Sequence, residues 1–238
     1  MMKSVFILLS SLLFFIATAC SHTPESIDIH SGKSSLNINS INNMLLLGAD
    51  LNIQERFTRE FREEISVWSA STNQLINKEL ENLLVVNSKL SRLDMLDVES
   101  INKTKSYISL IKDVSKEIWI HSRGWNFWPH KMENFDYTIG DGLSSLKYKN
   151  SIDTMLFLDG FQTVKVRKKE LNKESIYSYE RDNIIFDTLF IQLMLIDITT
   201  GEILWVKFNE FENVDLRSPI EIRIILSETL KGFPGKVS

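Results

Sequence analysis

The stretch Thr188–Ile196, TLFIQLMLI, limits the folds open to this chain more than any other segment. If it is a β-strand, alternation of side chains places Leu189, Ile191, Leu193 and Leu195 on one face. Phe190, Met194 and Ile196 share the other face with Thr188 and Gln192. A strand that is apolar on both faces belongs in the middle of a sheet covered on both sides. The sequence therefore predicts a layered domain with a buried sheet.

The same strand runs into the motif LIDITTGEILW, Leu195–Trp205. An Asp, a Thr-Gly pair and a Trp at this spacing are typical of one β-propeller blade, but the motif does not recur along the chain, and a propeller requires repetition. We interpret it as a single hairpin in which Gly201 supplies the positive φ of a short turn. Trp205 is expected on the strand face of Ile203 and Lys207, packed on the neighbouring strand.

Other elements follow from apolar periodicity. The predicted elements are a buried strand at Asn43–Asp50, an amphipathic helix carrying Phe57, Phe61, Ile65 and Trp68 and continuing toward Leu80, a second strand at Leu83–Asn87, a long helix from Val98 to about Arg123, a short helix carrying Leu143 and Leu146, and a strand at Met155–Leu158.

The C-terminal segment carries signals for a closing helix. Ser218, Pro219 and Glu221 fit an N-cap, a first-position proline and a capping-box Glu. Gly232 and Pro234 supply the stop. Although residues 220–224 alternate like a strand, these signals favour a helix.

The order of these pieces resembles a group of bacterial envelope lipoproteins related to the curli-secretion subunit CsgG and the N-terminal domain of TolB. The resemblance rests on the Asp-x-x-Thr-Gly hairpin, on FDYTIGDGLSSLKYKNSIDTMLFLDGF (135–161) and on the closing helix DLRSPIEIRIILSETLKGFPG (215–235). It implies an α+β fold, with a mixed, mostly antiparallel sheet flanked by helices. It also implies a non-catalytic scaffold or an assembly or secretion accessory that acts through protein–protein contacts. Relatives in the curli and Pel export systems form rings, and the TolB domain docks to partners.

One segment departs from the curli-type pores, which carry long membrane-spanning hairpins. A membrane hairpin needs about ten residues of apolar–polar alternation per strand. Residues 164–173, VKVRKKELNK, place charges on consecutive positions and leave no lipid-facing stripe. The sequence therefore predicts a solvated hairpin tip at Lys165–Lys173, with contact to lipid phosphate as the alternative.

The N-terminus is typical of a lipoprotein signal. Lys3 precedes an apolar run from Val5 to Ile16, which is shorter than the ~20 residues that span a bilayer. Small residues then lead to Cys20, the single cysteine in the chain. This arrangement resembles the bacterial lipobox, in which the cysteine is acylated and becomes the new N-terminus. Residues 1–19 are thus predicted as the signal peptide, 20–40 as the lipidated Cys20 and a flexible tether, and 41–238 as one α+β domain.

The resemblance to the lipobox also sets the expected location and partners. Ser21 after the cysteine favours the outer membrane, and we expect the protein on its periplasmic face. The formal charge of the 238-residue chain is −4, which argues against nucleic acid as a partner. We predict a membrane anchor, a protein partner or homo-oligomer, no metal and no cofactor.

The aromatic segment WIHSRGWNFWPH, residues 119–130, holds the candidate partner-binding residues Arg123, Trp125 and Trp128. Exposed aromatic rings and arginine are typical of interface centres. The alternative is a loop folded over the sheet edge with its aromatics as anchors. His121 and His130 are weak metal candidates because the sequence identifies no third ligand.

Two rival functions remain open. Asp153, Asp159, Asp187 and Asp197 lie around the strands, and two facing carboxylates beside the aromatic segment would suit a periplasmic cell-wall glycan hydrolase. A carbohydrate-binding lipoprotein without catalysis is the other alternative. Gly140–Gly142 before a short helix offers a phosphate site, against simple helix capping by Asp141.

Overall fold

The sheet predicted from the central strand forms the middle layer of the protein. The computed structural model describes residues 26–30, 41–57, 62–87, 90–96, 98–123, 128–146, 152–166, 168–171, 174–177 and 184–234. Within them the main sheet has the strand order β1-β9-β8-β5-β2-β3, and β4 also pairs with β2. The strands are β1 (Ser26–His30), β2 (Asn43–Arg56), β3 (Arg62–Glu64), β4 (Arg92–Met95), β5 (Thr154–Val166), β8 (Ile184–Asp197) and β9 (Ile203–Phe211).

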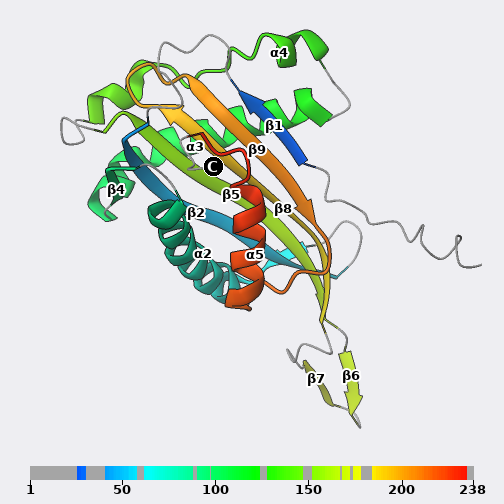
Figure 1. Cartoon of the computed structure of the whole chain (residues 1–238). Coiled ribbons are helices and arrows are strands. Elements are labelled where there is room, and N and C mark those ends of the chain that lie inside the picture. The colour runs from blue at the N-terminus through cyan, green and yellow to red at the C-terminus, as the bar shows by residue number, and fades with distance from the viewer. Residues whose placement is uncertain are drawn as a thin grey trace, which may run out of the picture.

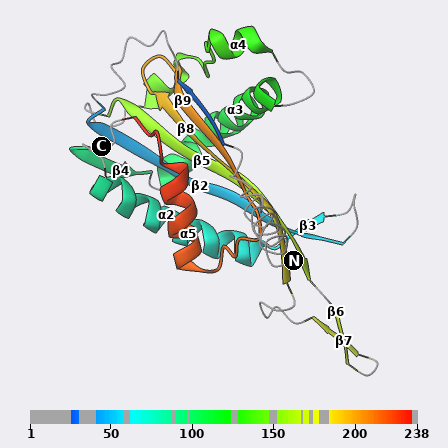
Figure 2. The ribbon, with the colours of Figure 1, turned by 45° about the vertical axis from the view of Figure 1, so that its right-hand side comes forward.

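The sheet is mixed and mostly antiparallel, as predicted. β2 runs parallel to β4 and β5, whereas the β5–β8, β8–β9, β1–β9 and β2–β3 pairs are antiparallel. Helices cover both faces (Figures 1 and 2). They are α2 (Ser66–Asn87), α3 (Val98–Arg123), α4 (Pro129–Glu133), the 3₁₀ helix η2 (Asp141–Leu146) and α5 (Pro219–Thr229). The α+β class of the sequence prediction is confirmed.

Each face of the sheet buries its own hydrophobic cluster. On one face, Ile76 and Leu80 of α2 and Leu226 of α5 pack over the sheet. On the other, Ile111 and Ile118 of α3 do so. A sheet enclosed by two helical layers explains why β8 is apolar on both sides.

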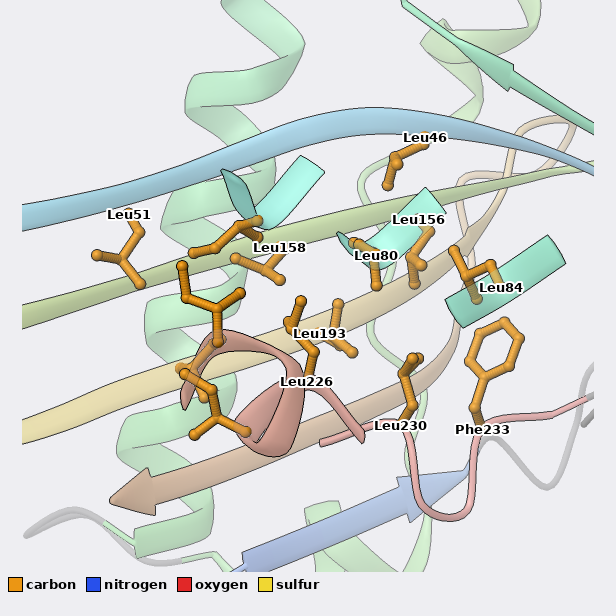
Figure 3. Packing of buried hydrophobic residues seen from close by; sticks show 14 of the residues in the cluster. Leu46, Leu51, Leu80, Leu84, Leu156, Leu158, Leu193, Leu226, Leu230 and Phe233 are labelled. Atoms are coloured by element: carbon orange, nitrogen blue, oxygen red, sulfur yellow. The ribbon is translucent and has the colours of Figure 1, made fainter. Parts of the chain in front are cut away.

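From these strands the sequence predicts a core of Leu156, Phe157, Leu189, Ile191, Leu193 and Leu195, and this core is confirmed. Leu156, Leu189, Ile191, Leu193 and Leu195 belong to the cluster beneath α2 and α5. Phe157 lies on the opposite face, beneath α3. Figure 3 shows Leu193 beside Leu226 of α5, and both belong to the cluster beneath α2 and α5.

One predicted element was right only in part, and another was wrong. The predicted helix through Trp68 toward Leu80 is present, but it starts only at Ser66: Phe57 follows the end of β2, and Ile65 lies between β3 and the helix start. Phe61 lies outside the described residues. The Ile65 N–H donates to the Ile53 carbonyl at 2.8 Å, which extends the pairing with β2 up to the helix start. The expected strand at Leu83–Asn87 is instead the last part of α2, where Leu84 is buried and Val85 and Val86 are exposed.

Strand β1 lies inside the segment predicted as a flexible tether. Ser26–His30 pairs along β9 from Asn209 to Trp205. The Asp28 carboxylate accepts a hydrogen bond from the Trp205 indole N–H at 2.6 Å and lies 3.2 Å from Lys207 Nζ. These buried partners explain why a polar segment joins the sheet. Residues 1–25 and 31–40, which include Cys20, lie outside the described residues.

The hairpin between β8 and β9 is confirmed, with φ +70° at Gly201. The Asp197 carboxylate accepts from the backbone N–H groups of Thr199 and Thr200 at 2.7 and 3.2 Å. One detail was wrong: Trp205 does not share a face with Ile203. The register shifts by one residue at Leu204, since Ile196 pairs with Ile203 and Leu195 with Trp205. This bulge places Leu204 and Trp205 in one cluster and Ile203 in the other.

Two shorter predictions also have outcomes. In the segment predicted as a solvated hairpin tip, residues 165–166 still belong to β5. Beyond them, β6 (Lys168–Leu171) pairs antiparallel with β7 (Glu174–Tyr177) in a ribbon that projects from the end of β5 and β8 (Figures 1 and 2). The closing helix α5 is confirmed, and Ser218 caps it by accepting from the Glu221 N–H. The Glu221 carboxylate departs from the capping box, because it accepts from the Asp215 N–H at 2.6 Å.

Candidate functional site

The β8–β9 hairpin turn holds the segment that carries the candidate site. The Ile139 N–H donates to the Gly201 carbonyl at 2.9 Å, and the Ile203 N–H donates to the Tyr137 carbonyl at 3.0 Å. Gly201 approaches Gly140 so closely that a Cβ at Gly201 would lie 1.9 Å from the Gly140 oxygen. The glycine of the Asp-x-x-Thr-Gly motif therefore has a second role besides its positive φ, since it lets residues 137–140 pack onto the turn.

Three aromatic rings meet where α3 gives way to α4. His121 and Trp128 stack with ring centroids 4.4 Å apart and planes 10° apart. Trp128 and His130 are also near-parallel, with centroids 6.0 Å apart. The backbone N–H of Trp128 donates to the backbone carbonyl of His121 at 3.1 Å, which ties the start of α4 to the end of α3. These contacts fix the Trp128 ring while 44% of the residue stays exposed.

Tyr137 supports the cluster from the hairpin side. Its hydroxyl is hydrogen-bonded to His121 Nδ1, and His121 Nε2 lies 3.6 Å from Glu117. Burial, with the nearby carboxylates of Glu117 and Asp136, raises the pKa of Tyr137 to about 12. The phenol thus stays protonated at physiological pH. In the neutral tautomer that directs Nε2–H toward Glu117, His121 Nδ1 accepts the proton of that phenol.

We call His121, Trp128, His130 and Tyr137 the aromatic cluster. Lys131 lies over the Tyr137 ring, with Nζ 5.4 Å from its centroid, and pairs with Asp136 at 2.6 Å. A fixed, half-exposed Trp beside His and Lys side chains suits binding of another protein surface better than proton-transfer chemistry. Among the described residues, no three His, Cys, Asp or Glu side chains are placed to hold a metal ion.

The structure describes only some of the predicted site residues. Trp128 is described, and it belongs to the cluster. Arg123 ends α3, but its side chain is not among the described ones, and Trp125 and Cys20 lie outside the described residues altogether. Trp119, at the start of the aromatic segment, packs against Phe190 and Phe208 on the α3 side of the sheet. The partner-binding role of Arg123, Trp125 and Trp128 stays a prediction.

Tyr137 is the residue that sequence reasoning missed. It lies in FDYTIGDG, a stretch that resembles a family motif, but the sequence analysis assigns no role to Tyr137 itself. Its partner His121 is 16 residues away in sequence. A signal existed in the alternation of Phe135, Tyr137 and Ile139, which places three apolar or aromatic side chains on one face of an extended segment.

Two of the four carboxylates predicted around the strands, Asp187 and Asp197, have structural roles. Asp187 pairs with Arg56 at 2.7 Å and accepts from Thr163, and Asp197 caps the hairpin turn. Asp159 also has a partner, the Gln192 amide at 3.3 Å, but it differs in lining a cleft beneath α3 together with Asp113 and Trp119.

The Gly140–Gly142 segment favours the structural reading over the phosphate site. The Gly140 N–H donates to the Thr138 hydroxyl at 3.0 Å, and Asp141 begins η2. A Cβ at Gly142 would lie 2.6 Å from the Tyr107 ring, so this glycine allows α3 to approach η2.

Within the described ranges, none of the helices is both long and apolar enough to cross a bilayer.

Comparisons with known proteins give a remote likeness only. No protein-family model matches the chain, and no curated protein matches it. Among solved structures, PelC dodecamers from Paraburkholderia phytofirmans match at 8% identity, with TM-scores of 0.38 for a leucine-to-methionine variant and 0.37 for a second crystal form. Each match covers 90% of this chain, and 99% and 100% of the PelC chain respectively. The C-terminal domain of LpoB from Salmonella enterica matches at 10% identity with a TM-score of 0.30, over 72% of this chain and 83% of that chain. Scores at this level do not assign the chain to either family.

Proposed function

We propose that this protein is a non-catalytic lipoprotein of the outer membrane, anchored through Cys20, that acts as a scaffold or as an assembly or secretion accessory. It does so by binding a protein partner, or further copies of itself, through the aromatic cluster. The observation that carries the partner contact is the Trp128 ring, half-exposed and held in place by stacking on His121.

The position of β1 constrains how such an anchor would hold the domain. Five residues separate Cys20 from Ser26, the first residue of β1. At full extension this connection spans about 20 Å. The sheet edge formed by β1 would therefore stay close to the bilayer, instead of moving on the tether of about 20 residues (21–40) that the sequence suggested.

The aromatic cluster has the features of an interface anchor. A ring already fixed by neighbouring side chains loses little conformational entropy on binding, so more of its buried area contributes to affinity. His130 and Lys131 surround it with polar groups that suit the rim of an interface. Tryptophan is enriched among residues whose truncation costs about 2 kcal/mol or more of binding energy.

Crosslinking in intact cells tests the partner contact. Wild-type protein should give a crosslinked complex that survives sizing in detergent, with a second protein or with another copy. Trp128→Ala should weaken this complex strongly, and Trp125→Ala combined with Trp128→Ala should abolish it, while thermal unfolding of the variants stays close to wild type.

Phe161→Ala is the matched control, because Phe161 is also 44% exposed but belongs to β5. It should leave the complex intact. A wild-type protein that is strictly monomeric and captures no neighbour would contradict the proposal. A folded double variant that still forms the complex would remove the two tryptophans from the interface.

A further inference from the structure

A cleft of about 460 Å³ lies on the α3 side of the sheet, away from the aromatic cluster residues. It lies between the second half of α3 and the middle of β5 and β8. Its volume falls within the range of about 300–1,000 Å³ found for small-molecule sites.

Aromatic rings form one wall of the cleft. Trp119 of α3 meets Phe190 of β8 edge-on, with centroids 4.4 Å apart, and Phe190 lies 5.5 Å from Phe161 of β5. Phe161 is 44% exposed although it belongs to a strand whose other residues are mostly buried. An exposed ring at the mouth of a cleft offers a flat apolar surface for a ligand.

Hydrogen-bonding groups line the inner part of the cleft. The Gln192 amide donates to Asp159 Oδ2 at 3.3 Å and also contacts the Ser115 hydroxyl. Gln192 and Ser115 are 3% and 1% exposed. Burial raises the pKa of Asp159, while Lys112 lowers it. These groups are aligned by register, since Asp159 pairs with Gln192 across β5 and β8.

The charges of the cleft balance. Lys112 and Lys116 oppose Asp113 and Asp159 in the lining, and Lys112 is also paired to Asp50 at 2.5 Å. Because two ammonium groups and two carboxyl groups line the cleft, a charged ligand would meet as many like charges as opposite ones. Hydroxyl groups both donate and accept, so they match a lining that mixes ammonium, amide, hydroxyl and carboxyl groups.

We propose that this cleft binds an uncharged sugar residue, with its flat apolar face against Phe161 and Trp119 and its hydroxyl groups hydrogen-bonded to Asp159 and Lys112, while Gln192 holds Asp159 in place. The ligand class follows from the aromatic wall together with the neutral, mixed polar floor. The site is separate from the proposed partner interface and does not depend on it.

Titration of the detergent-solubilised full-length protein tests this proposal. Cellobiose, maltose and N,N′-diacetylchitobiose are titrated up to about 20 mM by calorimetry and by tryptophan fluorescence, a range that reaches weak millimolar sites. At least one should bind with 1:1 stoichiometry. Phe161→Ala and Asp159→Asn should each weaken binding about tenfold or more, and Phe161→Tyr, which keeps the ring, should retain it.

Phe57→Ala is the matched control, since Phe57 is a phenylalanine at 41% exposure outside the cleft lining. It should bind as wild type does, and so should Trp128→Ala. The proposal is overturned if none of the three sugars binds, or if Phe161→Ala and Phe57→Ala bind equally well. Binding accompanied by release of monosaccharide would keep the sugar site but contradict the non-catalytic function proposed above.

Discussion

Leu193→Ala tests whether β8 is the fully covered centre of the sheet. Leu193 is 0% exposed, pairs with Leu158 of β5 on one side and Lys207 of β9 on the other, and faces Leu226 of α5 (Figure 3). Removing three buried carbons loses about 2.4 kcal/mol of transfer free energy, at about 0.8 kcal/mol per carbon. The cavity left between two rigid layers adds a further term. The total loss in the free energy of unfolding should be about 2.7–5 kcal/mol.

Urea unfolding and thermal unfolding measure this loss. For a domain of this size, it corresponds to a fall in Tm of about 5–20 °C. Leu110→Ala on α3 is the matched control, because Leu110 is 39% exposed and loses the same atoms with less buried surface. It should cost much less than the β8 substitution. A loss below about 0.5 kcal/mol for Leu193→Ala, or equal losses for the two variants, would refute the covered-sheet reasoning.

Three further outcomes are expected. Asp28→Ala should reduce the free energy of unfolding, measured in urea, by about 1–3 kcal/mol, because the ammonium of Lys207, which is 7% exposed, loses its carboxylate partner. A variant as stable as wild type would mean that β1 does not pack on β9. Gly201→Ala should cost more than about 1 kcal/mol and broaden the NMR signals of residues 137–140, owing to its positive φ and to the Gly140 oxygen, which would lie 1.9 Å from the added Cβ; unchanged spectra would argue against this close approach. The pKa of Asp159 is raised in the folded state, so ionisation of this carboxyl destabilises the fold as the pH rises through that pKa. Asp159→Asn should therefore stabilise the protein at pH 7, and by progressively less toward about pH 4. A gain in stability that does not change with pH would contradict a buried, ionised Asp159.

The sheet was predictable where alternation and burial coincide. The alternation within residues 188–196 predicts both faces of β8, and the turn residues at 197–201 predict the hairpin that follows. The final helix was predictable although its sequence alternates, because Ser218 and Pro219 supply a start that a strand does not need.

The errors arose where long-range pairing overrides local spacing. Phe57 and Ile65 are separated by two helical turns, yet β3 pairs with the end of β2 and Ile65 itself bonds back to Ile53. The bulge at Leu204 shifts Trp205 to the other face, and nothing in the local sequence marks that shift. In the same way, β1 looks like a tether because its partners, Trp205 and Lys207, lie about 180 residues away.

The candidate sites were predictable only in part. Trp128 was identified from the density of aromatic residues, but its stacking on His121 and the link to Tyr137 depend on the hairpin turn that holds residues 137–139. The cleft at Asp159 was not predicted, because it needs the register of β5 and β8 and the packing of α3 across them.

Lipid attachment at Cys20 is the most direct test of the proposed function, because both the location and the closeness of the β1 edge to the membrane depend on it. Cells expressing the protein are labelled with radioactive palmitate, and the outer-membrane fraction is isolated. The account predicts label in the wild-type protein and none in Cys20→Ala, with the variant lost from that fraction while its domain still folds. Equal labelling of both proteins, or an unlabelled wild type, would contradict the account.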